Sequence, residues 1–182
     1  MRAVRVRSDE MEVIIQKAGQ EFAKVISVLA STTFYEAYFE QDTPIDIANY
    51  IAESFSPETI GDELADETIE YYLAFAGHHA AGYIKLVRGT EAEGIDSQIS
   101  LELKRIYVVE RFWRAGIGEK LLNFAKSRAT EQGFAYLWLG VWQENARAQR
   151  FYAKFGFEKV GAITFPYGDT VGINDVLRVK AY

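Results

Sequence analysis

The chain has 182 residues, of which 49% are apolar, 25% are charged and 14% are aromatic. This length is typical of one domain, and so high an aromatic content is uncommon in disordered chains. The formal net charge of −6 argues against a broad basic surface for nucleic acid. The sequence contains no cysteine, which excludes disulfides, thiolate metal ligands and a cysteine nucleophile. We therefore expect a single folded domain over residues 1–182.

The two histidines of the sequence, His78 and His79, are neighbours in the turn that AFAGHHAAG predicts. Adjacent residues of a strand point to opposite faces, so the pair is poorly suited to hold one ion, and no metal is expected. There is no apolar run of about 20 residues, and no signal-like apolar stretch follows the N-terminal MRAVRVRSDE. These features predict a cytoplasmic protein with no membrane partner and no nucleic-acid partner.

The first third of the chain predicts one strand and three helices. A short strand is expected at 13–16, and apolar residues at helical spacing predict a helix over 22–39. Thr43 is a good N-cap for a second helix over 44–55, because a proline follows at the first helical position. Another proline opens a short helical segment over 57–65.

Strand-forming segments dominate the middle of the chain. The segments 69–77 and 80–89 are rich in aromatic and aliphatic residues, and the GHHA between them predicts a hairpin. Polar residues over 89–98 predict a loop. The segment ISLELKRIYVV, 99–109, is the longest strand candidate, since aliphatic residues are interleaved there with charged ones.

Strands and helices alternate in the second half of the chain. A helix is expected over 118–133, a buried strand over 134–142 and a further helix over 145–155. This order implies parallel strands joined by crossover helices. The tail predicts two antiparallel strands with a turn around Pro166–Asp169. The fold class expected is α/β with a mixed sheet.

Gly116 and Gly118 mark a strand-to-helix turn in ERFWRAGIGEKLL. Such a turn lets a ligand approach the first unpaired N–H groups of the helix. These N–H groups together form a site for an anion. Arg111 and Arg114 flank it, so a diphosphate is the natural ligand. The Walker pattern is absent because no GKS or GKT follows, and the dinucleotide pattern GxGxxG fails at Leu121. A tight turn without a ligand is the alternative interpretation.

Two blocks in this half resemble one enzyme family. The segment ELKRIYVVERFWRAGIGEKLL is similar to the acetyl-CoA-binding core of the GNAT N-acetyltransferases, in which a turn of the form Q/R-x-x-G-x-G/A holds the pyrophosphate of CoA. NARAQRFYAKFGF, 145–157, resembles that family's next motif. The likeness of the core covers 99–160. It implies a central sheet of about six to seven strands flanked by about four helices, with acetyl-CoA as co-substrate and no metal. Trp113 departs from the pattern, which has Gln or Arg there.

The resemblance also implies the residues that bind CoA. Backbone groups at Ile106 and Val108 would pair with the pantetheine arm like an added strand, and the glycine turn would hold the phosphates. Asn145 would cap the next helix and contact pantetheine, while Lys154 would reach the phosphates or face water. The cofactor-binding residues implied are Ile106, Tyr107, Val108, Arg114, Ala115, Gly116, Ile117, Gly118, Glu119, Asn145, Tyr152 and Lys154.

Two residues are candidates for moving protons. Transfer to an amine needs a neutral nitrogen, so a base must take a proton from the ammonium, directly or through water. The resemblance places Glu102 in that role; the alternative is an exposed strand carboxylate paired with Lys104 or Arg105. Tyr152 matches the family tyrosine that gives a proton to the departing thiolate, although a helix aromatic of this kind is often only a core residue.

The sequence does not identify the amine that accepts the acetyl group. Residues 31–64 and the tail resemble the bacterial spermidine/spermine acetyltransferase subgroup, and helices within 22–66 would shape the acceptor site. A protein or peptide amino group, another small amine, or a non-catalytic acetyl-CoA sensor are alternatives. The aromatic tail would either seal a homodimer or cover the sheet. The side chains available to a polyamine are Glu36, Glu40, Asp42, Asp46, Glu53, Tyr35 and Tyr38.

Overall fold

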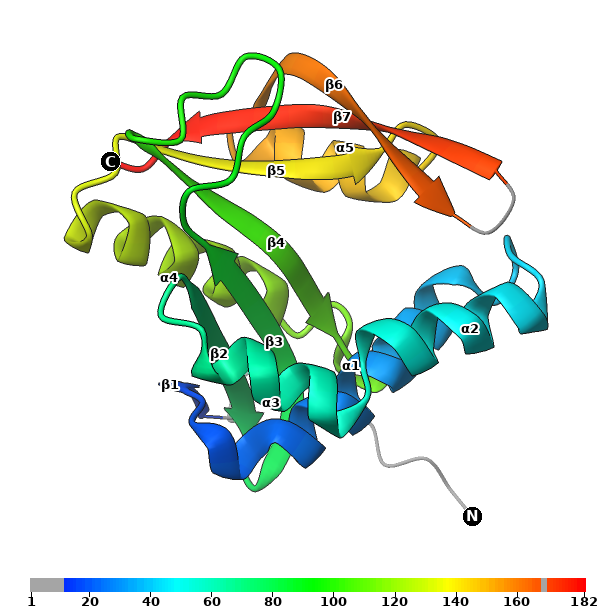
Figure 1. Ribbon diagram of the computed structural model, residues 1–182. Helices are drawn as coiled ribbons and strands as arrows, with labels where there is room; N and C mark the ends of the chain where they lie inside the picture. Colours follow the sequence, from blue (N-terminus) through cyan, green and yellow to red (C-terminus); the bar gives the residue numbers. More distant parts are fainter. Residues whose placement is uncertain (1–11, 168–169) are drawn as a thin grey trace.

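A mixed seven-stranded sheet with the strand order β1-β2-β3-β4-β5-β7-β6 organises the molecule (Figure 1). The computed structural model describes residues 12–167 and 170–182. Only β4 and β5 are parallel neighbours; every other adjacent pair is antiparallel. The strands are β1 Val13–Lys17, β2 Ile69–Ala76, β3 His79–Val87, β4 Ser100–Val108, β5 Tyr136–Trp142, β6 Glu158–Tyr167 and β7 Thr170–Lys180.

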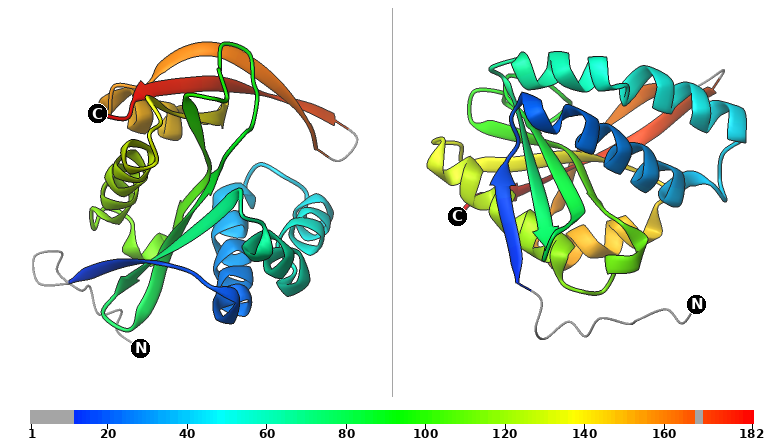
Figure 2. Two further views of the ribbon diagram at one scale, coloured as in Figure 1. Left: turned by 60° about the vertical axis from the view of Figure 1, so that its left-hand side comes forward. Right: turned by 90° about the horizontal axis from the view of Figure 1, so that it is seen from below.

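Five α-helices cover the sheet, one more than the roughly four that were expected. Helices α1, α2 and α3 lie on one face, and α4 lies on the opposite face (Figure 2). Short 3₁₀ turns at Gln20–Phe22 and Glu110–Phe112 precede α1 and α4. The helices are α1 Ala23–Tyr38, α2 Pro44–Ser54, α3 Pro57–Ala65, α4 Ile117–Glu131 and α5 Ala146–Lys154.

Local sequence signals placed most of these elements correctly. Thr43 caps α2, its hydroxyl accepting the Asp46 N–H at 3.2 Å, and the hairpin of β2 and β3 is confirmed. The segment at 57–65 is a full helix because Ser56 caps it in the same way. The tail strands β6 and β7 are antiparallel as predicted. The turn predicted between them includes residues 168–169, which lie outside the described residues, as does the N-terminal MRAVRVRSDE.

The prediction that His78 and His79 point apart is wrong, because their ring centroids are 3.9 Å apart. His79 begins β3, but His78 belongs to the tight turn before it. The alternation of a strand therefore does not apply to the pair.

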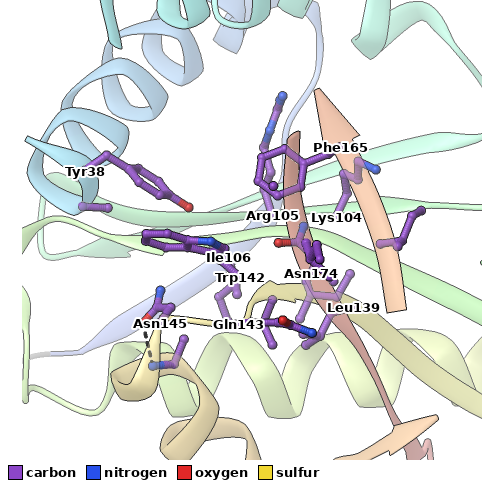
Figure 3. A pocket seen from close by; sticks show the side chains of 18 of the residues that line it. Tyr38, Lys104, Arg105, Ile106, Leu139, Trp142, Gln143, Asn145, Phe165 and Asn174 are labelled. Carbon is purple, nitrogen blue, oxygen red and sulfur yellow. Dashed lines mark hydrogen bonds between the residues drawn. The ribbon is translucent and has the colours of Figure 1, made fainter. Parts of the chain in front are cut away.

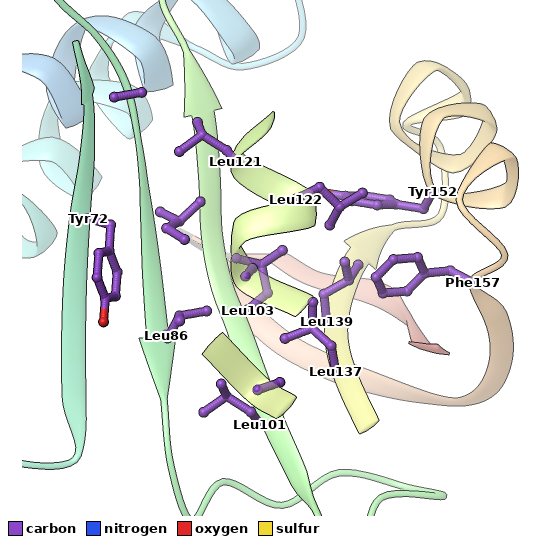
Figure 4. Packing of buried hydrophobic residues seen from close by; sticks show 14 of the residues in the cluster. Tyr72, Leu86, Leu101, Leu103, Leu121, Leu122, Leu137, Leu139, Tyr152 and Phe157 are labelled. Atoms are coloured by element: carbon purple, nitrogen blue, oxygen red, sulfur yellow. The ribbon is translucent and has the colours of Figure 1, made fainter. Parts of the chain in front are cut away.

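Two apolar cores lie on the two faces of the sheet. One joins α4 and α5 to the strands, with Leu103, Leu121 and Leu122 among its buried side chains (Figure 4). The other joins α1, α2 and α3 to the opposite face and is rich in aromatic rings, including Phe34 and Phe55. Burial on both faces fixes the central strands firmly, so groups at their ends are held on a rigid frame.

The contact between β4 and β5 is short. The predicted parallel pairing covers only three residue pairs, from Ser100 with Tyr136 to Glu102 with Trp138. On its other edge β5 pairs with β7 along its whole length, from Tyr136 to Trp142, and in Figure 1 the β5, β7 and β6 unit leans away from β4. Within the described chain, β5 gives β4 no partner beyond Glu102. The sheet therefore opens in its middle.

A β-bulge in β4 changes which side chains face each core. Lys85 pairs with Arg105 and Leu86 pairs with Leu103, so Lys104 is the additional residue. After the bulge, Tyr107 packs with the α1 side. Simple alternation over 99–109 does not predict this, because it would put Lys104 and Arg105 on opposite faces.

Gly82 on β3 tests how tightly the central strands pack. A Cβ at this position would lie 2.6 Å from the Tyr107 carbonyl oxygen. We expect Gly82→Ala to lower the free energy of unfolding by about 2 kcal/mol, because the two strands must move apart. The matched change is Gly61→Ala in α3, where a Cβ would meet its nearest atom, Gln20 Oε1, at 3.7 Å. It should raise stability by about 0.5–1 kcal/mol. Urea unfolding followed by circular dichroism measures both; equal stabilities would contradict this packing.

Candidate active site

A cavity of about 680 Å³ occupies the opening between β4 and β5. Its walls come from α1, α2, β4, β5, α5, β6 and β7. Figure 3 shows Tyr38 of α1, Trp142 at the end of β5 and Phe165 of β6 around this space. The size is that of an ordinary small-molecule site. Segments far apart in the sequence therefore meet here around one ligand-sized space.

The glycine turn leads from β4 into α4 and leaves several amides free. Gly116 has a φ of 76° and Arg114 a φ of 67°; in the described chain Arg114 is the sole non-glycine residue with a positive φ. Strained backbone of this kind is common at ligand sites. Ala115 N–H already donates to the Phe112 carbonyl at 3.2 Å. Among the described residues no acceptor pairs with the N–H groups of Arg114, Gly116, Ile117, Gly118 and Glu119.

Trp113, the departure from the family pattern, ties this turn to β4. Its indole Nε1–H donates to the Val108 carbonyl at 2.7 Å. The Arg147 guanidinium from α5 lies 3.8 Å from the centroid of the same ring. Trp113 thus links the end of β4, the turn and α5. The contact with Arg147 could not be read from the local sequence, because the fold brings α5 to this ring.

The edge of β4 that faces the opening carries free backbone groups. Val109 N–H donates to Ala81 of β3 at 2.9 Å. Because an antiparallel ladder alternates, the N–H and C=O groups of Val108 and Ile106 point the other way, toward β5. The Val108 carbonyl accepts the Trp113 indole, which leaves the Val108 N–H and both Ile106 groups toward the opening. An extended ligand with amides can pair along this edge.

Tyr152 projects from α5 into the cavity. Asn145 caps this helix as expected, its Oδ1 accepting the Ala148 N–H at 2.9 Å, and it also lines the cavity. Figure 4 shows the Tyr152 ring extending toward Leu122 of α4. Burial raises the pKa of the Tyr152 phenol, and the nearby Tyr107 adds to the effect. The phenol therefore remains protonated at neutral pH and can donate a hydrogen bond.

Glu102 lies at the last residue pair before β4 and β5 separate. It is 3% exposed, so the alternative of an exposed strand carboxylate is wrong. Lys104 does pair with it, Nζ to Oε1 at 3.1 Å. Its other oxygen, Oε2, is buried and has no hydrogen-bond partner in the described residues. Arg105 pairs elsewhere, with its guanidinium 4.6 Å from the Phe55 ring centroid and 3.8 Å from Glu63 Oε2.

Other expected residues lie in different surroundings. Lys154 is exposed and outside the residues that line the cavity. The side chain of Tyr107 packs with the α1 side of the sheet. Of the carboxylates available to a polyamine, only Asp42 lines the cavity; Glu36 accepts the Glu110 N–H at 2.9 Å, and Asp46 accepts the Thr43 hydroxyl at 2.7 Å.

Most of the cavity wall was not predicted from the sequence. Trp138, Trp142 and Phe165 all line it, although none of the three was singled out as a site residue. The run FAYLWLGVW did predict a buried strand. Which distant segments enclose its cavity face is not visible in the sequence; residues of α1, β4, β6 and β7 do so in the structure.

The described residues contain no group of three or more His, Cys, Asp or Glu side chains that could hold a metal ion. None of the helices in the described part of the chain has the length and apolar character needed to span a bilayer.

Comparison with known families identifies the kind of protein to which this cavity and glycine turn belong. The model of the acetyltransferase (GNAT) family matches residues 29–157, which is more than half of the chain. The chain belongs to the GNAT family. The short contact of β4 and β5, the turn into α4 and the capped α5 are thus parts of a GNAT acetyltransferase, and the protein is an acetyl-CoA-dependent N-acetyltransferase.

Relatives and solved structures agree with this family. An uncharacterized N-acetyltransferase of Lactobacillus delbrueckii subsp. lactis is 30% identical over 86% of this chain and 90% of the relative. One from Mycobacterium tuberculosis is 30% identical over 80% of this chain and 89% of the relative. The crystal structure of PaiA N-acetyltransferase from Thermoplasma acidophilum in complex with coenzyme A has a TM-score of 0.76 at 24% identity, covering 93% and 99% of the two chains. This last likeness confirms the GNAT fold.

The hydrogen bond of Trp113 to Val108 predicts how strongly acetyl-CoA binding depends on this turn. Trp113→Phe keeps a ring beneath Arg147 but removes the hydrogen bond to Val108. We expect the Kd for acetyl-CoA to rise about fivefold, because a turn released from β4 must be ordered by the ligand. Calorimetric titration of both proteins measures the change, with circular dichroism as the control for folding. An unchanged Kd would show that the turn does not depend on this bond.

Proposed function

We propose that this GNAT enzyme transfers the acetyl group of acetyl-CoA directly to a primary amine while both substrates are bound. The observation that carries the proposal is the opening between β4 and β5. The free amides of the glycine turn lie at the end of β4, and Glu102 and Tyr152 line the same cavity. The turn would hold the diphosphate of CoA, and the free groups of Ile106 and Val108 would pair with its pantetheine arm.

Glu102 and Tyr152 would have complementary roles. Glu102 would accept the proton that the ammonium must lose before its nitrogen can attack the thioester carbon. A carbon–nitrogen bond then forms and the carbon–sulfur bond breaks. The protonated Tyr152 phenol would stabilise the departing sulfur by a hydrogen bond and supply its proton. Because the sequence has no cysteine, the acetyl group has no thiol of the protein to rest on, which favours direct transfer.

A polyamine such as spermidine or spermine is one candidate acceptor. The aromatic wall around Tyr38 and Tyr50, together with Asp42, supports this class, because aromatic faces and carboxylates attract ammonium groups. Lys104 and Arg105 also line the cavity and repel a multiply charged cation. A protein or peptide amino group, or a small amine with one charge, is therefore the alternative acceptor. A non-catalytic sensor is less well supported, since it would need neither Glu102 nor Tyr152.

The homodimer and the cytoplasmic location remain predictions.

The proposal predicts a large thermal shift with the co-substrate. At a concentration of about 100 times Kd, acetyl-CoA should add about 2.7 kcal/mol of stability. For a chain of this size, that corresponds to a rise in melting temperature of roughly 5–10 °C. NAD and ATP should give much smaller shifts, since neither presents a pantetheine arm. Equal shifts with all three ligands would remove the assignment of this site to acetyl-CoA.

Tyr152→Phe should lower kcat at least about tenfold while leaving the Kd for acetyl-CoA nearly unchanged, because the ring remains and only the proton donor is lost. The matched control is Tyr136→Phe on β5. Tyr136 lies outside the cavity wall, so its variant should keep wild-type kcat. Thiol release from acetyl-CoA measures both rates. Wild-type turnover in Tyr152→Phe would remove the phenol from the mechanism.

A panel of amines tests the function itself. Thiol release is measured with spermidine, spermine, lysine and a mixture of peptides, and the acetylated product is identified by mass spectrometry. Release with one of these amines defines the acceptor class. Tight acetyl-CoA binding without thiol release from any of them would favour the sensor.

A further inference from the structure

A largely buried arginine in the cavity wall lacks a hydrogen-bonded carboxylate. The side chain of Arg105 on β4 is 12% exposed, and it lines the cavity together with Phe55. The guanidinium carbon lies 4.6 Å from the centroid of the Phe55 ring. Within the described residues the guanidinium makes one hydrogen bond, from Nη1 to the Tyr71 hydroxyl at 3.3 Å. A neutral hydroxyl does not balance the charge of a cation, and buried charges are normally paired.

Glu63, the carboxylate nearest to this guanidinium among the ion pairs, is already engaged by other groups. Its Oε1 accepts a hydrogen bond from the Lys85 ammonium at 2.6 Å, and its Oε2 accepts one from the Tyr71 hydroxyl. Arg105 Nη1 is 3.8 Å from Oε2, which is too far for a hydrogen bond. Lys85 is buried as well. Two cations and one carboxylate therefore leave one positive charge unbalanced at the cavity wall.

Other carboxylates of the cavity do not balance this charge. Asp42 and Glu144 line the cavity, but none of the ion pairs between described residues joins either of them to Arg105. Glu102 pairs instead with Lys104 at 3.1 Å. The Nε and Nη2 atoms of Arg105 thus remain as donors for a ligand. A carboxylate suits them, because its two oxygens match two parallel N–H groups of a guanidinium.

The bulge in β4 turns Arg105 to the same face of the sheet as Glu102. Arg105 pairs with Lys85 of β3, whereas Glu102 pairs with Val87 of the same strand. Residues two apart on a strand share a face and lie about 6.7 Å apart along it. In Figure 3 the Arg105 side chain extends on the same side of the cavity as Phe165 of β6. A ligand whose ammonium faces Glu102 can therefore present an anionic group to Arg105 only a few bonds away.

We propose that Arg105 binds a carboxylate of the acceptor, so that the substrate is an amine with a carboxylate a few bonds from its nitrogen. This inference rests on the proposed function and narrows its class of acceptor. Amino acids and acidic peptides belong to this class, whereas spermidine and spermine bring only positive charge. One carboxylate matches the one unbalanced charge beside Arg105, which the charge of a phosphate group exceeds.

Binding to the protein saturated with CoA tests the carboxylate site without turnover, because CoA has no acetyl group to transfer. The probes are β-alanine, γ-aminobutyrate and glutamate, each compared with the amide in which its terminal carboxylate is replaced by a neutral group of the same shape. Calorimetric titration gives each Kd. We expect at least one acid to bind about tenfold or more tightly than its amide, because a charge-assisted hydrogen bond is lost in the amide.

Variants assign this preference to Arg105. Arg105→Gln should bring the Kd values of acid and amide within about twofold of each other, whereas Arg105→Lys keeps the charge and should retain part of the preference. The matched control is Arg88→Gln, since Arg88 lies outside the cavity wall and donates to the Glu67 carbonyl. It should keep the wild-type ratio. A purely structural arginine would weaken the binding of acid and amide equally. The comparison in the wild-type protein stands even where a variant does not fold.

Turnover then connects the site to the reaction. Thiol release from acetyl-CoA should favour the same acid over its amide and over spermidine by about tenfold or more in kcat/KM. Equal binding and equal turnover of every acid and its amide, binding by none of the acids, or better turnover of spermidine would overturn the inference and leave the acetyltransferase proposal intact. Tighter binding of an acid without thiol release from any amine would instead refute the proposed function and keep the carboxylate site.

Discussion

The early separation of β4 and β5 gives this structure its ligand-sized cavity. The two strands pair over only three residue pairs, because β5 is held on its other edge by the long antiparallel strand β7 and β4 carries a bulge at Lys104. Buried backbone groups are costly when they remain unpaired. The opened edge around Ile106 therefore leaves backbone groups with which a ligand that has amides of its own can pair.

The two ends of the opening are built by different means. At one end, positive φ angles at Arg114 and Gly116 turn the chain so that free amides face outward, and Trp113 fastens this turn to β4. At the other side, the Asn145 cap sets the start of α5 and so the place of Tyr152. The stacking of Arg147 on Trp113 joins the two sides. The glycine turn and Tyr152 are consequently parts of one frame and not independent loops.

Charges on the α1 side of the sheet are arranged by the bulge. Glu63 forms ion pairs with Lys85 at 2.6 Å and with Arg105 at 3.8 Å. Burial lowers the pKa of Lys85, the neighbouring Arg105 adds to that effect, and Glu63 opposes it. One carboxylate is thus shared by two cations, of which Arg105 also lines the cavity. With one carboxylate for two cations, this group keeps a net positive charge, which repels a further cation.

The sequence by itself determined the features whose causes lie within a few residues. These include the Thr43 cap, the hairpin of β2 and β3, the Asn145 cap and the turn at Gly116, because caps and turns depend on local hydrogen bonds and local φ angles. Tertiary structure decides how far β4 and β5 pair, the burial of Glu102, the stacking of Arg147 on Trp113 and the exposure of Lys154. Each of these depends on which distant segment arrives beside the residue and on the sheet face that the bulge at Lys104 selects, and neither is encoded in a short stretch of sequence.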